Sequence, residues 1–174
     1  MDVRRESEHT ATKNRTTADR KSERELVVTR VINGPARIVF EAFTKPELFK
    51  RWWVPKSFGL SLLSCELDVR AGGTYQLMFS HNGSEPMAFF GRYIEVTRHS
   101  RLVWTNEEGD DGGAVTTVTF EEQAGKTLVV VSDLYPSKEA LDAAIASGAT
   151  SGMPETLEQL DELVVSLGAS VGRS

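Results

Sequence analysis

EAFTKPELFKRWW, residues 41–53, is the stretch of sequence that decides the fold. Pro46 begins a short helix whose apolar side chains, among them Trp52 and Trp53, share one side, and a helix with its own apolar stripe precedes it. Gly59 follows, and the apolar spacing then changes to that of strands. We therefore expect an antiparallel sheet that folds around a core, with two short helices closing one end.

The rest of the chain predicts strands on both sides of these helices. A run rich in β-branched residues predicts the first strand at 25–32, and turn-forming residues separate six later runs at 62–69, 74–81, 87–96, 102–105, 114–121 and 127–134. Two helices are expected after them, at 138–146 and from Pro154 to about Leu167. On the last helix, apolar residues at spacings of four and three form one stripe, which we expect to pack against the sheet.

Length and composition indicate one domain with a charged tail. The chain has 174 residues, of which 40% are apolar, enough for one sizeable core. Residues 1–24 contain little to bury and are expected to be disordered, residues 25–167 to form the domain, and residues 168–174 to be a flexible C-terminus. The tail lacks the apolar core of a secretory signal, so the expected location is the cytoplasm.

Charge and cysteine content narrow the classes of partner. The tail holds seven of the 20 basic and five of the 25 acidic residues, which leaves the remaining chain with a charge of −7. That charge disfavours nucleic-acid binding, and no apolar run is long enough to insert into a membrane. The one cysteine, Cys65, cannot form an internal disulfide, and we expect it to be a small buried residue.

Motifs for metal, nucleotide or nucleophile chemistry are missing from the sequence. The three histidines lack metal-motif spacing, and no phosphate-cradling loop or nucleophile elbow occurs, so we expect no metal and no cofactor and assign no catalytic residue. Acid–base candidates nevertheless fall on or beside predicted strands. They are Glu66, Asp68, Arg92, Glu95, Asp133 and Tyr135. Any of them that pointed into an apolar cavity would have its pKa shifted by desolvation.

Several segments together resemble a known family. They read PARIVFEAFTKPELFKRWW at 35–53, CELDVRAGG at 65–73, GRYIEV at 91–96, RLVWT at 101–105, TTVTF at 116–120 and LEQLDELV at 157–164. Their joint pattern is similar to the homologues of the activator of the 90-kilodalton heat-shock-protein ATPase, within the START-like superfamily of polyketide cyclases and lipid-transport proteins. The resemblance covers about residues 24–167.

The resemblance implies an α+β helix-grip fold. In such a fold a curved antiparallel sheet of six to seven strands surrounds a long C-terminal helix, two short helices follow the first strand, and a mostly apolar cavity lies between sheet and C-terminal helix. Candidate ligand-binding residues are then the inward aromatic and apolar side chains and their polar neighbours. They are Trp53, Tyr75, Leu77, Phe79, Phe90, Arg92, Tyr93, Trp104, Met153, Leu157 and Leu160.

The chain departs from the family pattern at the start of the last helix, and two adjacent phenylalanines lie on one predicted strand. Where the family has a glycine followed by tryptophan, this chain has Gly152-Met153-Pro154, so the space that the last helix closes is expected to differ. Phe89 and Phe90 are adjacent on a predicted strand and cannot share a face, and the sequence does not decide which points inward.

Three functions remain open on these grounds. The first is non-catalytic binding of a small hydrophobic or amphipathic molecule. The second is a cofactor-free reaction of the cyclase or isomerase kind, with a cavity carboxylate or tyrosine as acid or base. The third is a co-chaperone that stimulates a heat-shock-protein ATPase through a surface contact with the chaperone. A monomer or a weak dimer is expected in each case.

Overall fold

The computed structural model describes residues 16–54, 57, 59–81, 85–107, 113–146 and 153–172, with side chains up to Leu167. Within these residues the chain forms eight strands and four helices. In chain order they are β1 (Thr17–Arg20), β2 (Glu25–Ile32), α2 (Ala36–Thr44), α3 (Pro46–Phe49), β3 (Leu60–Leu67), β4 (Thr74–His81), β5 (Met87–Thr97), β6 (Arg101–Thr105), β7 (Val115–Gln123), β8 (Lys126–Leu134), α4 (Lys138–Ala146) and α5 (Met153–Gly172).

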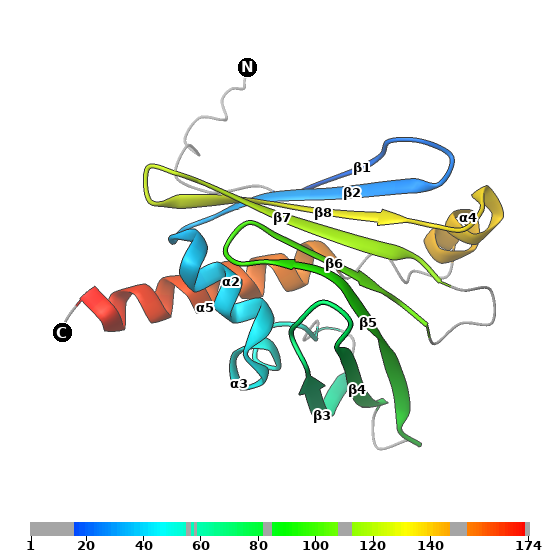
Figure 1. Cartoon of the computed structure of the whole chain (residues 1–174), viewed down its shortest axis with the longest axis horizontal. Helices are drawn as coiled ribbons and strands as arrows, with labels where there is room; N and C mark the ends of the chain where they lie inside the picture. The colour runs from blue at the N-terminus through cyan, green and yellow to red at the C-terminus, as the bar shows by residue number, and fades with distance from the viewer. Residues whose placement is uncertain are drawn as a thin grey trace.

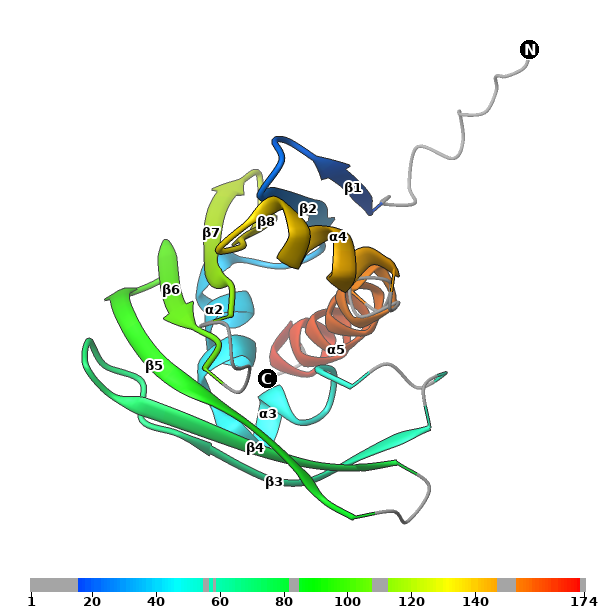
Figure 2. The same ribbon diagram turned by 90° about the vertical axis from the view of Figure 1, so that its right-hand side faces the viewer.

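All eight strands belong to one antiparallel sheet in the order β1-β2-β8-β7-β6-β5-β4-β3. Strands β3 to β8 each pair with their chain neighbours, whereas β2 pairs with β8, the last strand of the chain. Figure 1 shows α5 running along the sheet, and Figure 2 shows the sheet curving around α2 and α5 on its concave side. We call this concave side the inner face.

Helix α5 seals one half of the inner face. Its side chains Leu157, Leu160 and Val164 are fully buried and share one core with Val28 and Ile32 of β2. The loop before α2 approaches α5 so closely that a Cβ on Gly34 would lie 2.3 Å from a methyl carbon of Val164. Glycine at this position therefore allows helix and loop to pack against each other.

Polar contacts fix the helices to the sheet and to each other. Asp161 of α5 forms an ion pair with Arg30 of β2 at 2.9 Å and accepts a hydrogen bond from the backbone N–H of Asn33. Glu122 of β7 accepts a 2.8 Å hydrogen bond from the N–H of the first residue of α2, and so caps that helix from across the fold. The Gln159 amide of α5 donates to two carbonyls in the segment after α3.

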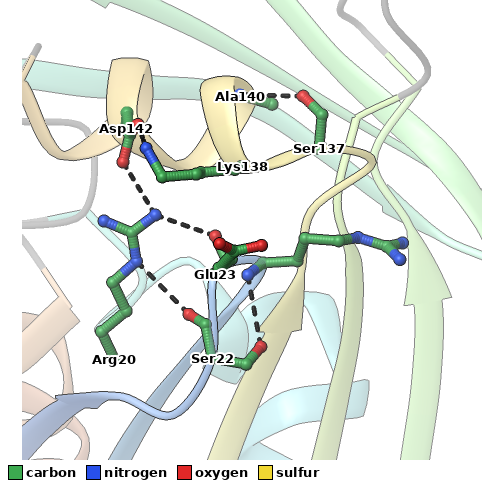
Figure 3. Close-up of polar contacts among 8 residues, drawn as sticks. Arg20, Ser22, Glu23, Ser137, Lys138, Ala140 and Asp142 are labelled. Carbon is green, nitrogen blue, oxygen red and sulfur yellow. Dashed lines mark hydrogen bonds and ion pairs between the residues drawn. The ribbon is translucent and has the colours of Figure 1, made fainter.

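The outer edge of the sheet is connected to α4 by a polar cluster (Figure 3). Arg20 at the end of β1 forms an ion pair with Asp142 of α4, at 2.7 Å, and Asp142 also pairs with Lys138. The hydroxyl of Ser137 accepts a hydrogen bond from the N–H of Ala140 and caps α4. The segment ahead of the first predicted strand is thus attached to the body at both β2 and α4.

The α+β helix-grip prediction is confirmed, with two corrections at the ends of the chain. The sheet has eight strands instead of six to seven, because β1 lies inside residues 1–24, which we expected to be disordered. All four β1 residues are exposed, and the strand forms because its backbone pairs with the edge of β2, so it leaves no apolar pattern in the sequence. Residues 1–15 lie outside the described part.

The last helix also extends farther than expected. It continues past Leu167 to Gly172, so residues 168–172 of the expected flexible C-terminus are helical, because nothing before Gly172 interrupts the backbone hydrogen bonding of α5. Residues 173–174 lie outside the described part. None of the helices in the described ranges is long and apolar enough to cross a membrane.

Candidate functional site

A cavity of about 40 Å³ lies between the inner face of β3–β6 and the helices α2 and α3. Most of the side chains that line it are aromatic or aliphatic, and they come from elements on both sides of the fold. They are Phe43, Phe49, Trp53, Leu67, Tyr75, Leu77, Phe89, Tyr93, Trp104 and Asn106. The cavity therefore has apolar walls and a few polar atoms, a composition typical of small-molecule sites.

The sheet wall of the cavity depends on a missing side chain in β5. Gly91 pairs with Tyr75 of β4, and Leu77 pairs with Phe89. Because Gly91 has no side chain, the Tyr75 ring can pass over β5, and its hydroxyl donates a 2.6 Å hydrogen bond to the carbonyl of Thr105 on β6. A Cβ on Gly91 would lie 2.1 Å from that carbonyl oxygen and 2.9 Å from the Tyr75 ring.

The helix wall consists of aromatic rings in mutual contact. Trp53 stacks on Phe49 with centroids 4.7 Å apart and meets Trp104 of β6 edge-on at 6.3 Å. Trp104 in turn lies 6.5 Å from the ring of Tyr93 on β5. The rings of the helix segment and the sheet therefore form a continuous aromatic lining, and such pairs add stability beyond their buried area.

The polar side of the cavity begins at Asn106 and leads away from it along the sheet. The Asn106 amide nitrogen donates to the carbonyl of Ala114 at 2.8 Å and to the hydroxyl of Thr116 at 2.9 Å. The Thr116 hydroxyl donates to Oδ1 of Asp133 at 2.5 Å. A chain of hydrogen bonds thus links a cavity-lining amide to a carboxyl group two strands away.

Burial changes the acidity of several groups on this face. It raises the pKa of Asp133, opposed by the hydrogen bond from Thr116, and it raises the pKa of Tyr135 to about 12 with help from the Asp133 charge. The Tyr93 hydroxyl also has its pKa raised well above the usual range, chiefly by burial. Burial raises the pKa of the Cys65 thiol to about 11, so this thiol is not an activated nucleophile.

Five of the residues expected to bind a ligand are brought together at the cavity: Trp53, Tyr75, Leu77, Tyr93 and Trp104. The other six lie elsewhere, for reasons of strand face or of packing. Phe79 is buried against Phe89, with ring centroids 5.0 Å apart, while Phe90 and Arg92 occupy the opposite face of β5.

The α5 residues in that expectation belong to the packed core. Leu157 and Leu160 are fully buried, and Met153 packs against the same core. Because α5 packs against β2 and α2, its stripe is covered by their side chains. The cavity thus lies under α2 and α3, where we expected it to lie between the sheet and the C-terminal helix.

Five lining residues were not among the candidates: Phe43, Phe49, Leu67, Phe89 and Asn106. Phe43 and Phe49 lie on the apolar sides of the two short helices, and a one-sided stripe does not by itself distinguish a cavity wall from core packing. The register of β5 against β4 decides between Phe89 and Phe90, and it places Phe89 inside. Nothing in the local sequence distinguishes Asn106 from an ordinary turn residue.

Of the six acid–base candidates, Asp133 lies on the inner face with a raised pKa. The others lie mainly in exposed ion pairs: Arg70 pairs with Asp68, Arg92 with Glu107, and Arg101 with Glu95. Among the described residues, no group of three or more His, Cys, Asp or Glu side chains is arranged to hold a metal ion.

Comparisons with known proteins agree with this architecture. A family model described as "Activator of Hsp90 ATPase homolog 1-like protein" matches residues 33–165, more than half of the chain. A solved structure from Chromobacterium violaceum is 30% identical, with a TM-score of 0.67, and the match covers 80% of this chain and 96% of that one. Among proteins with curated descriptions, none matches this chain.

Two further solved structures share the fold at lower identity. A protein from Nitrosomonas europaea is 24% identical with a TM-score of 0.78, and the match covers 86% of this chain and 99% of that chain. One from Rhodobacter sphaeroides is 21% identical with a TM-score of 0.79, covering 87% and 99%.

Proposed function

This chain belongs to the family of activator of Hsp90 ATPase homologue 1-like proteins, and we propose that it uses the helix-grip fold to bind a small, largely apolar molecule in the aromatic cavity. The observation that carries the proposal is the lining itself. Aromatic side chains from two helices and from the sheet converge on one space, and Asn106 adds a polar group at its edge. Affinity would come from apolar burial, and orientation from hydrogen bonds.

The size of the cavity sets a condition on the ligand. A space of about 40 Å³ has room for only a few water molecules, since one water needs about 10–15 Å³ on this measure. A ligand therefore enters only if a wall moves. Phe89 is the wall residue best placed to move, because 40% of its surface is exposed, whereas Leu77 and Trp104 are buried. We expect the ligand to displace the Phe89 ring.

The test is a titration of the protein with small aromatic compounds, followed by native mass spectrometry and tryptophan fluorescence. Leu67→Trp fills the cavity from β3, and Leu63→Trp is its matched control on the same strand, because Leu63 is 55% exposed and does not line the cavity. We expect Leu67→Trp to weaken binding at least about tenfold and Leu63→Trp to leave it unchanged, with folding of both variants checked by circular dichroism.

Two outcomes would remove the proposal. Equal affinity in the folded Leu67→Trp variant would show that the cavity is not the binding site. A wild-type protein that stays empty with every compound would leave the co-chaperone function of the family description as the one to test, by measuring the ATPase rate of a heat-shock protein with and without this chain.

A cofactor-free acid–base reaction on the inner face of the sheet is the second candidate. One observation favours it: Asp133 is an inner-face carboxyl group whose pKa burial raises, a property that general acids and bases share. Incubating the protein with each compound that binds, and measuring the mass and chirality of the recovered compound, would detect such a reaction. A compound recovered unchanged in every case would leave binding as the function.

A further inference from the structure

Among the described residues, the inward positions of β2, β7 and β8 hold three charged side chains, and two of them have a strong partner. Along β2, β7 and β8 the inward positions hold Arg30, Glu122 and Asp133. Arg30 pairs with Asp161 of α5, and Glu122 caps helix α2. Within the described part of the chain, Asp133 has only the hydroxyl of Thr116 as a partner, on Oδ1. Its Oδ2 accepts no hydrogen bond there.

Asp133 lies in line with the cavity. Tyr93, Trp104, Thr116 and Asp133 stand opposite one another on four successive strands, β5, β6, β7 and β8. Neighbouring strands are about 4.8 Å apart, so Asp133 lies about 10 Å from the position of Trp104, across one intervening strand. Tyr93 and Trp104 line the cavity. A ligand that is anchored there and extends along this row points toward Asp133.

The charge balance around Asp133 favours a cation. Desolvation raises the pKa of this carboxyl group, which means that its ionised form lacks a compensating charge. The protein as a whole carries a net charge of −5, which attracts cations and repels anions.

We propose that Asp133 selects a ligand with a cationic amine, and that the ligand class is an arylalkylamine or a similar compound with an ammonium group and an aromatic part. This inference rests on the proposed function. The aromatic part occupies the cavity, and the ammonium group donates a charge-assisted hydrogen bond to Oδ2 of Asp133. Between the cavity and Asp133, the ammonium group also makes cation–π contacts with the faces of Trp104 and Tyr93. Anionic amphiphiles, such as fatty acids, are rejected by the carboxylate.

The experiment compares three compounds that differ in one end group: 2-phenylethylamine, 2-phenylethanol and phenylacetate. Each is titrated into the wild-type protein, into Asp133→Asn and into Glu25→Gln. In Asp133→Asn the side-chain oxygen still accepts the hydrogen bond from Thr116, so the fold is retained. Glu25→Gln is the matched control, because Glu25 bonds to Ser132, the neighbour of Asp133 whose side chain faces the other way.

We expect the wild-type protein to bind the amine at least about tenfold more tightly than the alcohol, and phenylacetate most weakly, because hydrogen bonds to charged groups are the stronger ones. Asp133→Asn should lose the preference for the amine, and Glu25→Gln should keep it. The measurement is isothermal titration calorimetry, with folding of each variant checked by its thermal midpoint.

The results separate this inference from the proposed function. If the alcohol binds wild-type protein as tightly as the amine, or if Asp133→Asn keeps the preference, the amine inference is wrong and cavity binding stands. If none of the three compounds binds to the folded wild-type protein, both are wrong. The wild-type ranking needs no variant, so the inference can be overturned even if Asp133→Asn does not fold.

Discussion

The two halves of the inner face differ in how completely they are filled. Under α5, the strands β2 and β8 present aliphatic side chains that are fully buried, and the helix is held by the Arg30–Asp161 ion pair. Under α2 and α3, the strands β4 to β6 present aromatic rings with a cavity between them, and Phe89 is substantially exposed. The same sheet therefore has one closed half and one adaptable half.

Under the proposed function, the residues that stabilise this domain and those that bind the ligand lie in different halves of the inner face. Close packing makes the α5 half resist any change of volume. The aromatic half contains flat side chains that can change their contacts by rotation, and its unfilled space lowers the cost of admitting a ligand. We therefore expect substitutions in the two halves to have different consequences, beginning with the largest effect.

The largest loss of stability is expected in the closed half. Leu160→Ala removes a fully buried side chain and should lower the free energy of unfolding by about 2–5 kcal/mol, since the surrounding core cannot collapse into the space. Phe89→Ala removes more atoms, but from a partly exposed position at the cavity, and should cost less than about 1.5 kcal/mol. Urea denaturation followed by circular dichroism measures both. Equal losses would refute the contrast between the halves.

A smaller loss of stability is expected from a substitution at Gly91, where the Tyr75 ring crosses β5. Gly91→Ala places a Cβ against the Thr105 carbonyl and the ring, and overpacking of this kind costs about 1–3 kcal/mol. Because the ring must shift, the hydrogen bond from Tyr75 to Thr105 should be lost, and a changed Tyr75 ring signal in the NMR spectrum would report that loss. A variant that keeps both stability and ring signals would show that the sheet wall is adaptable at this point too.

The smallest change in the free energy of unfolding is expected from Asp133, and it depends on pH. Its pKa is raised in the folded protein, so between the ordinary and the raised pKa the folded state holds a proton that the unfolded state has lost. The free energy of unfolding then falls as pH rises through that window, by about 1.4 kcal/mol for each unit of pKa difference. Asp133→Asn lacks this loss and should be more stable than wild type at neutral pH.

The two proteins should converge as the pH is lowered below the ordinary aspartate pKa of about 3.9, where the unfolded state also holds the proton. Urea denaturation at several pH values provides the comparison. Two neighbouring groups titrate above this window: burial raises the pKa of Tyr135 to about 12, and the hydrogen bond to Asp142 raises the pKa of Lys138. A difference between the proteins that is constant with pH would contradict the prediction.

Much of the fold follows from the sequence because its signals are local. The bounds of β2, β4 and α4 agree with those expected from β-branched runs, turn residues and an N-cap. The aromatic rings of Trp53, Tyr75 and Trp104 were expected near the cavity, because bulky rings on alternating or one-sided positions face inward. Such patterns need no knowledge of the partner strand.

The remaining features depend on contacts between distant segments. Strand β1 exists because β2 has a free edge, and no residue of β1 is buried. The inward position of Asp133 was hidden because both faces of β8 carry valines, so alternation did not mark the inner one. Phe89 and Phe90 could be told apart only by the register with β4. Asn106 directly follows β6, and its hydrogen bonds to Ala114 and Thr116 hold it at the cavity.

The pairing of β2 with β8 has a consequence for how the chain acquires its structure. Glu25 pairs with Leu134, more than 100 residues later, whereas every pair from β3 to β8 joins chain neighbours. Contacts that distant in sequence slow folding, because a long loop must close before they form. In a chain that is still being synthesised, β2 emerges early and finds this partner only when β8 appears. Until then the segment ELVVTRVI is a β-branched strand without its partner β8, and an unpaired strand of this kind favours aggregation.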